Sequence, residues 1–370
     1  MQKIKPWFAA MALAVLSQAS QGQILIGQTA GFTGPVSAGV KETTDGAKLY
    51  LDAVNAKGGV GGQKIELVSL DDKFEPPLAA ENARKLIEEN NVTAMFLTRG
   101  TPHNEAILPL LEKYGVPLVA PSTGAMVLHQ PVKRYVFNVR ATYQREAEKA
   151  VAYLASIGIT RIGVLFADDS FGADGVTGAQ KGFAAVKFQP VVLEKFSRAK
   201  PDFSAIAPKI VQANAQAVIM VASGQTVVDG LKALRAAGST AQLVTLSNNA
   251  SSGFIKSLGE NARGVIVTQV FPSERSISYP MVKEAQELAK AKGIAEISPA
   301  MLEGFAAAKV MVEALRRAGA KPSRDKIQAA LESIKKFDIG GLEVNFSPDD
   351  HTGLDFADLS IIGTDGKFKR

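Results

Sequence analysis

Hydrophobic and polar positions follow two alternating patterns along the chain from about residue 24. Short, continuous apolar runs are typical of strands buried on both faces of a sheet, and segments with helical spacing separate them at a period of roughly 25 to 35 residues. The runs are ILIGQTA (24–30), KIELVSL (64–70), TAMFL (93–97), VPLVA (116–120), RIGVLFA (161–167), QAVIMVA (216–222), QLVTLS (242–247) and GVIVTQ (264–269). Strand, helix, strand order predicts parallel sheets with right-handed crossovers and helices on both faces.

Two of the intervening segments predict well-defined helices. Apolar residues recur at helical spacing over 147–157, and Gly158 stands where a C-terminal cap belongs. The same pattern runs over 227–234 and ends at Gly238. A third helical segment contains Pro109, which predicts a late helix start or a kink.

The number of strands argues for two sheets. A chain of 370 residues exceeds the usual size of a single core, and one open sheet of more than eight strands would be long. The best position for a break is 140–143, because YVFNVRATYQRE looks extended and is followed by a new helix and a new series of strands. The C-terminal part predicts hairpin-like strands in GLEVNF and ADLSIIG, separated by the turn-rich SPDDHTG.

The N-terminal segment predicts a secretory signal peptide. Lys3 and Lys5 precede an apolar run over 7–16, and small residues follow, with cleavage expected after Ala19 or, second, after Gly22. The alternative is a membrane anchor, but this run is about half of the roughly 20 residues that a span requires. We therefore expect a soluble periplasmic protein whose signal peptide is cleaved.

Composition excludes several classes of chemistry. The chain has no cysteine, so disulfides, zinc–thiolate sites, lipid acylation at cysteine and cysteine nucleophiles are excluded. The formal net charge is +6, to which Lys3 and Lys5 contribute, and no basic block stands out. Because nucleic-acid-binding proteins usually cluster Lys and Arg, a nucleic-acid partner is not expected.

Hydroxyl, amide and glycine residues follow the strand-like runs. In open α/β sheets, ligands bind outside the carboxyl ends of the strands, near helix N-termini. The segments at these ends are LTRGTP (97–102), APSTGA (120–125), FADDSFG (166–172), VASGQT (221–226) and LSNNASS (246–252). Each one alone is explained by helix capping, but five together favour a shared polar cleft in addition.

Catalytic and metal-binding motifs are missing. The sequence contains neither a G-x-S-x-G elbow nor a G-x-x-x-x-G-K-[ST] phosphate loop. The glycine-rich KGGVGGQK (57–64) follows a helix and precedes a strand, so it is a turn rather than a dinucleotide fingerprint. His103, His129 and His351 lack ligand-like spacing, which favours surface or capping roles over metal binding. We expect no metal and no cofactor.

Two kinds of charged residue leave alternatives open. The carboxylate pairs 71/72, 168/169 and 349/350 could do acid–base work only if one member were desolvated and positioned, and capping of turns is the more common role. An exported α/β enzyme that uses such a pair is the alternative function. Arg99 offers a rigid fork of donors suited to a carboxylate, or it is a solvated surface arginine.

Three longer segments carry a family resemblance. They cover 29–76, which opens with TAGFTGP and contains NAKGGVGGQKIEL, 161–183 (RIGVLFADDSFGADGVTGAQKGF) and 202–221 (DFSAIAPKIVQANAQAVIMV). They resemble the leucine/isoleucine/valine-binding family of type I periplasmic solute-binding proteins, which serve ABC importers. The likeness runs in order from residue 24 to near the C-terminus.

The resemblance implies a fold and a function. It implies two doubly wound α/β lobes joined by three hinge crossovers, with the ligand held between them and closure on binding. Residues 23–142 and 271–353 would form the first lobe, 143–270 and 354–370 the second, and 1–22 the signal peptide. The implied role is an extracytoplasmic receptor, monomeric and not an enzyme, that presents a small amino acid-like or carboxylate ligand to an inner-membrane ABC permease.

The resemblance also implies site residues. In that family the first-lobe loops that match LTRGT and PSTGA hold the ligand's carboxylate through backbone amides and hydroxyls. The implied first-lobe residues are Thr98, Arg99, Gly100, Thr101, Ser122, Thr123 and Gly124. The implied second-lobe residues are Phe171, Ser223 and Ser247.

Two departures from the family pattern bear on the ligand. Ser247 replaces the acidic residue that pairs with the ammonium group in the family's amino-acid binders, and an unpaired buried ammonium is costly. Phe74 and Thr98 stand where the family has a disulfide. The lost acid together with the added Arg99 suggests a carboxylate ligand without an α-amino group, such as an aromatic or other small organic acid.

Overall fold

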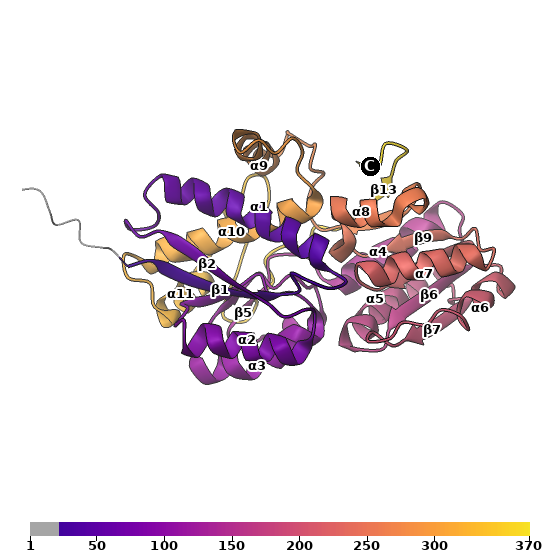
Figure 1. Cartoon of the computed structure of the whole chain (residues 1–370), viewed down its shortest axis with the longest axis horizontal. Helices are drawn as coiled ribbons and strands as arrows, with labels where there is room; N and C mark the ends of the chain where they lie inside the picture. The colour runs from indigo at the N-terminus through magenta and orange to yellow at the C-terminus, as the bar shows by residue number, and fades with distance from the viewer. Residues whose placement is uncertain (1–21) are drawn as a thin grey trace, which may run out of the picture.

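The computed structural model describes residues 22–370 as two α/β lobes (Figure 1). The sheet of the first lobe is parallel, in the order β2-β1-β3-β4-β5. Its strands are β1 (Ile24–Ala30), β2 (Ile65–Asp71), β3 (Ala94–Phe96), β4 (Leu118–Val119) and β5 (Val136–Phe137). This is a doubly wound order, in which the chain reverses direction between β1 and β3.

Helices cover both faces of the first sheet. One face packs against α2 and α3, and the other packs mainly against α1 and α10, which lie together in Figure 1. The helices are α1 (Ser37–Ala56), α2 (Pro76–Glu88), α3 (Thr101–Tyr114), α9 (Pro280–Ala291), α10 (Pro299–Ala318) and α11 (Arg324–Glu332), with a short 3-10 turn, η1 (Met126–Leu128). Because both faces are buried, the strands are continuous apolar runs.

The second lobe repeats the plan with two additional antiparallel strands. Its sheet has the order β14-β13-β10-β9-β8-β6-β7. The strands are β6 (Ile162–Ala167), β7 (Val192–Phe196), β8 (Ala217–Val221), β9 (Gln242–Thr245), β10 (Ile266–Gln269), β13 (Asp358–Ile362) and β14 (Phe368–Lys369). The chain reverses between β6 and β8, so each lobe has its own switch point.

The helices of the second lobe also divide between two faces. One core contains α4 (Tyr143–Ser156) and α5 (Ser170–Val186). The other contains α6 (Ala207–Gln212), α7 (Gln225–Ala236) and α8 (Ser252–Leu258). Two further 3-10 turns are η2 (Ser247–Asn249) and η3 (Gly259–Ala262).

The chain passes between the lobes three times. It leaves the first lobe after β5 and begins α4 at Tyr143, returns after β10, and leaves again between β12 (Glu343–Val344) and β13. The boundaries expected at 142/143, 270/271 and 353/354 lie in these connecting segments, and we keep them as predictions. The signal peptide expected over 1–22, with its cleavage site, lies almost wholly outside the described residues.

The structure corrects the expected C-terminal hairpin. GLEVNF and ADLSIIG do not pair: β12 pairs with β11 (Phe337–Asp338), whereas β13 pairs with β10 and β14. The reason is that the segment between them, which contains SPDDHTG, crosses from one lobe to the other instead of forming a tight turn.

Two other local expectations were incomplete. The helix that contains Pro109 does not start late, because it begins at Thr101 with Gly100 as its N-cap, and buried Ile107, Leu110 and Leu111 hold it in place. The β7 strand lacked a continuous apolar run because it lies at the edge of its sheet with alternate residues exposed. Within residues 22–370, no helix has the length and apolarity to cross a membrane.

Candidate functional site

The candidate site lies where the carboxyl ends of the strands of both lobes face one another. Loops after β1, β3 and β4 come from the first lobe, and loops after β6, β8 and β9 come from the second. The backbone N–H of Gln225 donates to the Pro35 carbonyl at 3.0 Å, so the loops touch directly. Ligands of doubly wound sheets bind at such switch points, and here two of them are opposed.

Arg99 is the cation that joins the two sides. It follows β3, is only 5% exposed, and makes a bridge pair with Ser122 after β4. Its Nη1 donates to Ser122 Oγ at 2.9 Å and its Nη2 to the Asn248 carbonyl of the second lobe at 2.6 Å. The alternative of a solvated surface arginine is therefore wrong, and Asn248 is a partner that the sequence interpretation did not include.

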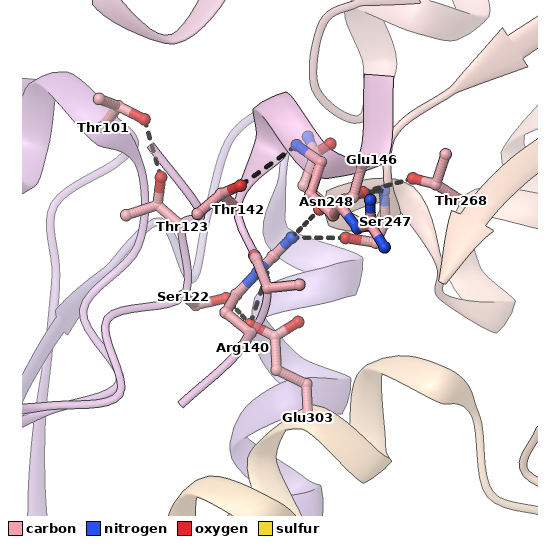
Figure 2. Close-up of polar contacts among 12 residues, drawn as sticks. Thr101, Ser122, Thr123, Arg140, Thr142, Glu146, Ser247, Asn248, Thr268 and Glu303 are labelled. Atoms are coloured by element: carbon pink, nitrogen blue, oxygen red, sulfur yellow. Dashed lines mark hydrogen bonds and ion pairs between the residues drawn. The ribbon is translucent and has the colours of Figure 1, made fainter. Parts of the chain in front are cut away.

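The other predicted hydroxyls of the first lobe bond within their own loops. Thr98 Oγ1 donates to Asn104 Oδ1 at 2.5 Å, and the hydroxyls of Thr101 and Thr123 lie 2.8 Å apart. Figure 2 shows Thr101 and Thr123 pointing toward each other. These side chains therefore fix the loop conformation, whereas Arg99, held by Ser122, reaches across the interface to the Asn248 carbonyl.

Two predicted glycines are explained by close packing. Gly100 has φ +92°, and a Cβ there would lie 2.5 Å from Nδ1 of His103. A Cβ on Gly124 would lie 2.6 Å from the Ala141 carbonyl. Both positions require glycine for the path of the backbone.

The three predicted residues of the second lobe have different surroundings. Ser223 Oγ accepts a hydrogen bond from Asn248 Nδ2 at 2.9 Å, so Ser223 belongs with the Arg99 bridge. The Phe171 ring is buried and meets Tyr143 edge-on, with centroids 4.9 Å apart. Ser247 Oγ accepts from Arg140 Nη2 at 2.6 Å, so its hydroxyl is occupied by a group at the hinge.

Arg140, Glu146 and Glu303 form a buried group that we call the hinge charge cluster. Arg140 is paired with Glu146 and lies 3.7 Å from Glu303, so it contacts carboxylates from α4 of one lobe and α10 of the other. Figure 2 follows the contacts onward: Glu303 accepts from Ser122 Oγ at 2.7 Å, and Glu146 accepts from the Ser247 N–H at 2.9 Å. A polar chain thus runs from the Arg99 bridge to the hinge.

Electrostatics explains why Arg140 stays charged. Burial alone would lower the pKa of its guanidinium, but the carboxylates of Glu146 and Glu303 outweigh burial and raise the pKa above its ordinary value. One arginine faces two carboxylates, and Arg99 is linked to them through Ser122. No sequence motif connects these residues, because Glu303 lies far along the chain from Arg140 and Glu146.

Phe74, Phe171 and Arg198 form a second feature that we call the aromatic slot. The Arg198 guanidinium lies 5.2 Å from the Phe74 ring centroid of the first lobe and 5.7 Å from that of Phe171 in the second. Its Nε donates to Asp169, which also caps α5 by accepting from the Gly172 N–H at 3.0 Å. Sequence reasoning missed Arg198 because it follows β7, the strand that had not been identified.

A cavity between the lobes provides space for a ligand. An interlobe cavity of about 470 Å³ contains Arg99 and no aspartate or glutamate among its described lining residues. Its walls are formed by 34–39, Arg99, Gly224, Gln225, 248–249, Ser251, Gly253, Phe254 and Ser257. The cavity has the size of a small-molecule site.

A larger cavity lies elsewhere. It measures about 1220 Å³ and is bounded by α8, α9 and the β13–β14 turn. It includes neither Arg99 nor the loops at the carboxyl ends of β3 and β4. We place the candidate site in the smaller cavity because strand ends, helix N-termini and a buried cation meet there.

The histidines are not at the surface, contrary to expectation. All three are at most 2% exposed. Burial lowers the pKa of both His103 and His129 to about 4, and it also lowers the pKa of His351. His103 stacks on Phe74 and His351 stacks on Phe137, so they act as packed aromatic rings. Within residues 22–370, no cluster of His, Asp and Glu is arranged to hold a metal ion.

The carboxylate pair 71/72 supports the aromatic slot rather than a reaction. Asp72 is fully buried, and burial raises its pKa to about 6. It accepts from the Phe74 N–H at 2.9 Å and from Thr29 Oγ1 at 3.0 Å, which fixes the loop that carries Phe74. Asp71 accepts from Thr33 Oγ1 at 2.6 Å at the surface. Both carboxylates cap turns.

The comparisons with known proteins agree with the two-lobed fold. Residues 23–357 match the sequence profile of the family described as periplasmic binding protein. The chain is 26% identical to the Leu/Ile/Val-binding protein BraC3 of Rhizobium johnstonii, with 89% of this chain and 88% of that protein covered. It is 25% identical to the Leu/Ile/Val-binding protein homolog 3 of Brucella melitensis, with 86% of each covered.

Solved structures show the same fold. A substrate-binding periplasmic protein from Ralstonia solanacearum is 30% identical and aligns with a TM-score of 0.86, covering 94% of this chain and 99% of that one. An extracellular ligand-binding receptor from Verminephrobacter eiseniae is 29% identical, with a TM-score of 0.84 and coverage of 94% and 100%. With its two opposed doubly wound lobes, the chain belongs to the periplasmic binding protein family and is similar over 86 to 89% of its length to leucine/isoleucine/valine-binding proteins.

Proposed function

We propose that this protein is an extracytoplasmic receptor that closes its two lobes over a small amino acid-like or carboxylate solute and presents it to an inner-membrane ABC permease. The observation that carries the proposal is the interlobe cavity, whose described lining includes one arginine and no acidic residue. A site of that charge favours an anionic group on the solute. The leucine/isoleucine/valine-binding relatives support the choice of a solute in this size range.

The first-lobe loops and Arg99 would hold the solute's carboxylate. Arg99 is already in position, because Ser122 orients one terminal nitrogen and the Asn248 carbonyl orients the other. A bound carboxylate would replace or join these partners, and desolvation makes such a pair strong. Thr98, Gly100, Thr101, Thr123 and Gly124 shape the loops that present Arg99 and Ser122.

Whether the site can bind an ammonium group of the solute depends on the surroundings of Ser247. Its hydroxyl accepts from Arg140, and the nearby Glu146 is paired with the same arginine. The position of Ser247 therefore offers no carboxylate of its own to a ligand ammonium, which supports a carboxylate solute without an α-amino group. Ser223 and Phe171 would border the solute from the second lobe.

The proposed receptor function also implies where the protein acts and how it assembles. The receptor would act in the periplasm after removal of residues 1–22, as a monomer, and without cofactor or nucleic acid. Conformational closure would be driven by contacts that the solute makes with the second lobe only in the closed form. The lobe boundaries at 142/143, 270/271 and 353/354 would be the hinges of that motion.

The enzyme alternative is not favoured by any observation. None of the three aspartate pairs lines the interlobe cavity. Asp168 pairs with Lys195 at the surface, and Asp169 caps α5. Asp350 accepts from the Thr352 N–H at 2.9 Å in a turn. We therefore propose that the protein performs no bond chemistry.

A thermal-shift screen tests the proposed function. Amino acids, aromatic acids and amides are added singly, and each stabilising compound is recovered after prolonged incubation and analysed by mass spectrometry. A receptor returns the compound unchanged, whereas conversion into a product would favour the enzyme. Arg99→Ala should weaken a carboxylate solute by about 2 to 5 kcal/mol in binding free energy, and unchanged affinity would remove Arg99 from the site.

A further inference from the structure

Arg198 has terminal donors that the protein leaves available. Its Nε donates to Asp169, and its flat face lies against Phe74 and Phe171. Within residues 22–370, its two Nη groups make no hydrogen bond, and the side chain is 22% exposed. A guanidinium held at one edge by a carboxylate and packed against two rings presents its remaining fork in a fixed direction.

The other two arginines near the interface differ in this respect. Both terminal nitrogens of Arg99 have protein partners, one of them a carbonyl from the opposite lobe. Arg140 is enclosed by Glu146 and Glu303. Among these three, Arg198 is the one that can accept a new bidentate partner without losing an existing bond.

A small pocket lies beside the fork. It is lined by Pro35, Phe74, Ala167, Phe196, Arg198, Ala222, Ser223 and Thr226. Its volume of about 20 Å³ is just above the roughly 10 to 15 Å³ that one water needs. The pocket therefore suits a single polar functional group rather than a whole solute. Pro35 also lines the 470 Å³ cavity, so the two spaces are neighbours.

We propose that Arg198 determines specificity by binding a second carboxylate of the solute, with the rings of Phe74 and Phe171 on either side. The inference rests on the proposed function, and it narrows the solute to a short compound with a carboxylate at each end. One carboxylate lies at Arg99 and Ser122, and the other lies in the pocket beside Ser223. Phe74 belongs to the first lobe and Phe171 to the second, so a carboxylate can lie between the two rings only when the lobes close.

The chemistry favours a carboxylate at this position. The two Nη groups of a guanidinium match the two oxygens of a carboxylate, and such charge-assisted pairs are stronger than neutral hydrogen bonds. Asp169 holds Arg198 by Nε alone, which leaves the bidentate edge free. An apolar chain end in the same pocket would strip water from the guanidinium without replacing its hydrogen bonds, and this penalty discriminates against monocarboxylates.

Isothermal titration calorimetry with two matched pairs of probes tests the proposal. Glutarate is compared with pentanoate, and L-glutamate with L-norvaline, because each pair differs at one end of the molecule. The proteins are wild type, Arg198→Met, Arg198→Lys, and Lys195→Met as a control in which a neighbouring exposed lysine is removed. Thermal unfolding of each variant confirms that it is folded.

We expect the wild type to prefer the second carboxylate in at least one pair by about 10- to 100-fold. Arg198→Met should reduce this preference to less than about threefold, Arg198→Lys should retain part of it, and Lys195→Met should leave it unchanged. Equal weakening of both members of a pair in Arg198→Met would show that Arg198 only joins the lobes, and would overturn the proposal. Failure of all four probes to bind wild type would also overturn it, whereas the broader thermal-shift screen decides the proposed function separately.

Discussion

The hinge charge cluster gives the most quantitative prediction. Replacement of Arg140 by methionine keeps much of the side-chain volume and removes the cation that faces Glu146 and Glu303. Both carboxylates would remain buried with their hydroxyl and N–H partners, among them Ser122 Oγ and the Ser247 N–H. Those neutral donors do not cancel the charge.

The magnitude follows from the burial of the group. Removing one partner of a buried ion pair costs about 3 to 5 kcal/mol, because the remaining charge is uncompensated. The Arg140 and Glu146 side chains are 2% and 0% exposed, so solvent screening is weak. We expect Arg140→Met to lower the free energy of unfolding by about 4 kcal/mol at pH 7.

Equilibrium urea unfolding at pH 7 measures this effect. Arg145→Met is the matched control, since Arg145 lies five positions along the chain, is half exposed and pairs with exposed Asp355 at 3.6 Å. A surface substitution of this kind should cost under about 0.5 kcal/mol. A loss below about 1 kcal/mol for Arg140→Met would refute the view that the cluster is charged and tightly packed.

Three further predictions concern closure and pH. Glu42→Ala removes a carboxylate on α1 that accepts from the N–H groups of Ser252 and Gly253 across the interface, at 2.9 and 2.7 Å, and should weaken solute affinity about fivefold without changing the unfolding midpoint. Gly224→Ala should weaken affinity more than about tenfold, because its Cβ would lie 1.9 Å from the Pro35 carbonyl oxygen. Asp174→Asn should stabilise the protein above pH 6 by about 1 to 3 kcal/mol, because burial raises the pKa of Asp174 to about 6 from 3.8.

Each of these has a control or a contradicting result. Calorimetry on Lys41→Ala, an exposed neighbour, should show unchanged affinity, and an equal effect would make Glu42 irrelevant to closure. Gly259 has nearly the backbone angles of Gly224 but open space around it, so Gly259→Ala separates backbone strain from the clash.

The sign of the Asp174 effect follows from its raised pKa. The native state holds the proton on Asp174 more tightly than the unfolded state does. The stabilising contribution of protonated Asp174 is therefore full below pH 3.8 and is lost as the pH rises through about 6. Asparagine keeps Oδ1 as the acceptor for Gln144 and Met126 without the charge. The advantage of the variant in urea unfolding should therefore vanish below pH 4. An advantage that persists at low pH would contradict this explanation.

Much of the fold could be predicted because burial on both faces leaves a simple signal. The eight apolar runs coincide with β1 to β4, β6 and β8 to β10, since helices cover both sides of each sheet. The signal fails at β7 because an edge strand exposes alternate residues. Because β7 was not predicted, Arg198 in the loop after it was not predicted as a site residue either.

The position of the candidate site at the interface could be predicted, but the contacts within it could not. Strand order places the polar loops at the interface, and Arg99 lies there as expected. Whether a hydroxyl faces the ligand or a neighbour depends on side-chain direction, which spacing does not specify: Thr98 turns to Asn104 and Thr101 to Thr123. The hinge charge cluster joins residues of both lobes, so only the folded chain reveals it.

The central claim is that a small solute binds between the lobes at Arg99. Its most direct test is a crystal structure of the protein with a stabilising compound from the thermal-shift screen. The account predicts density for an unmodified compound in the interlobe cavity, with a carboxylate within hydrogen-bonding distance of Arg99 or Ser122. Density confined to the larger cavity between α8 and α9, or lobes that enclose no solute, would contradict it.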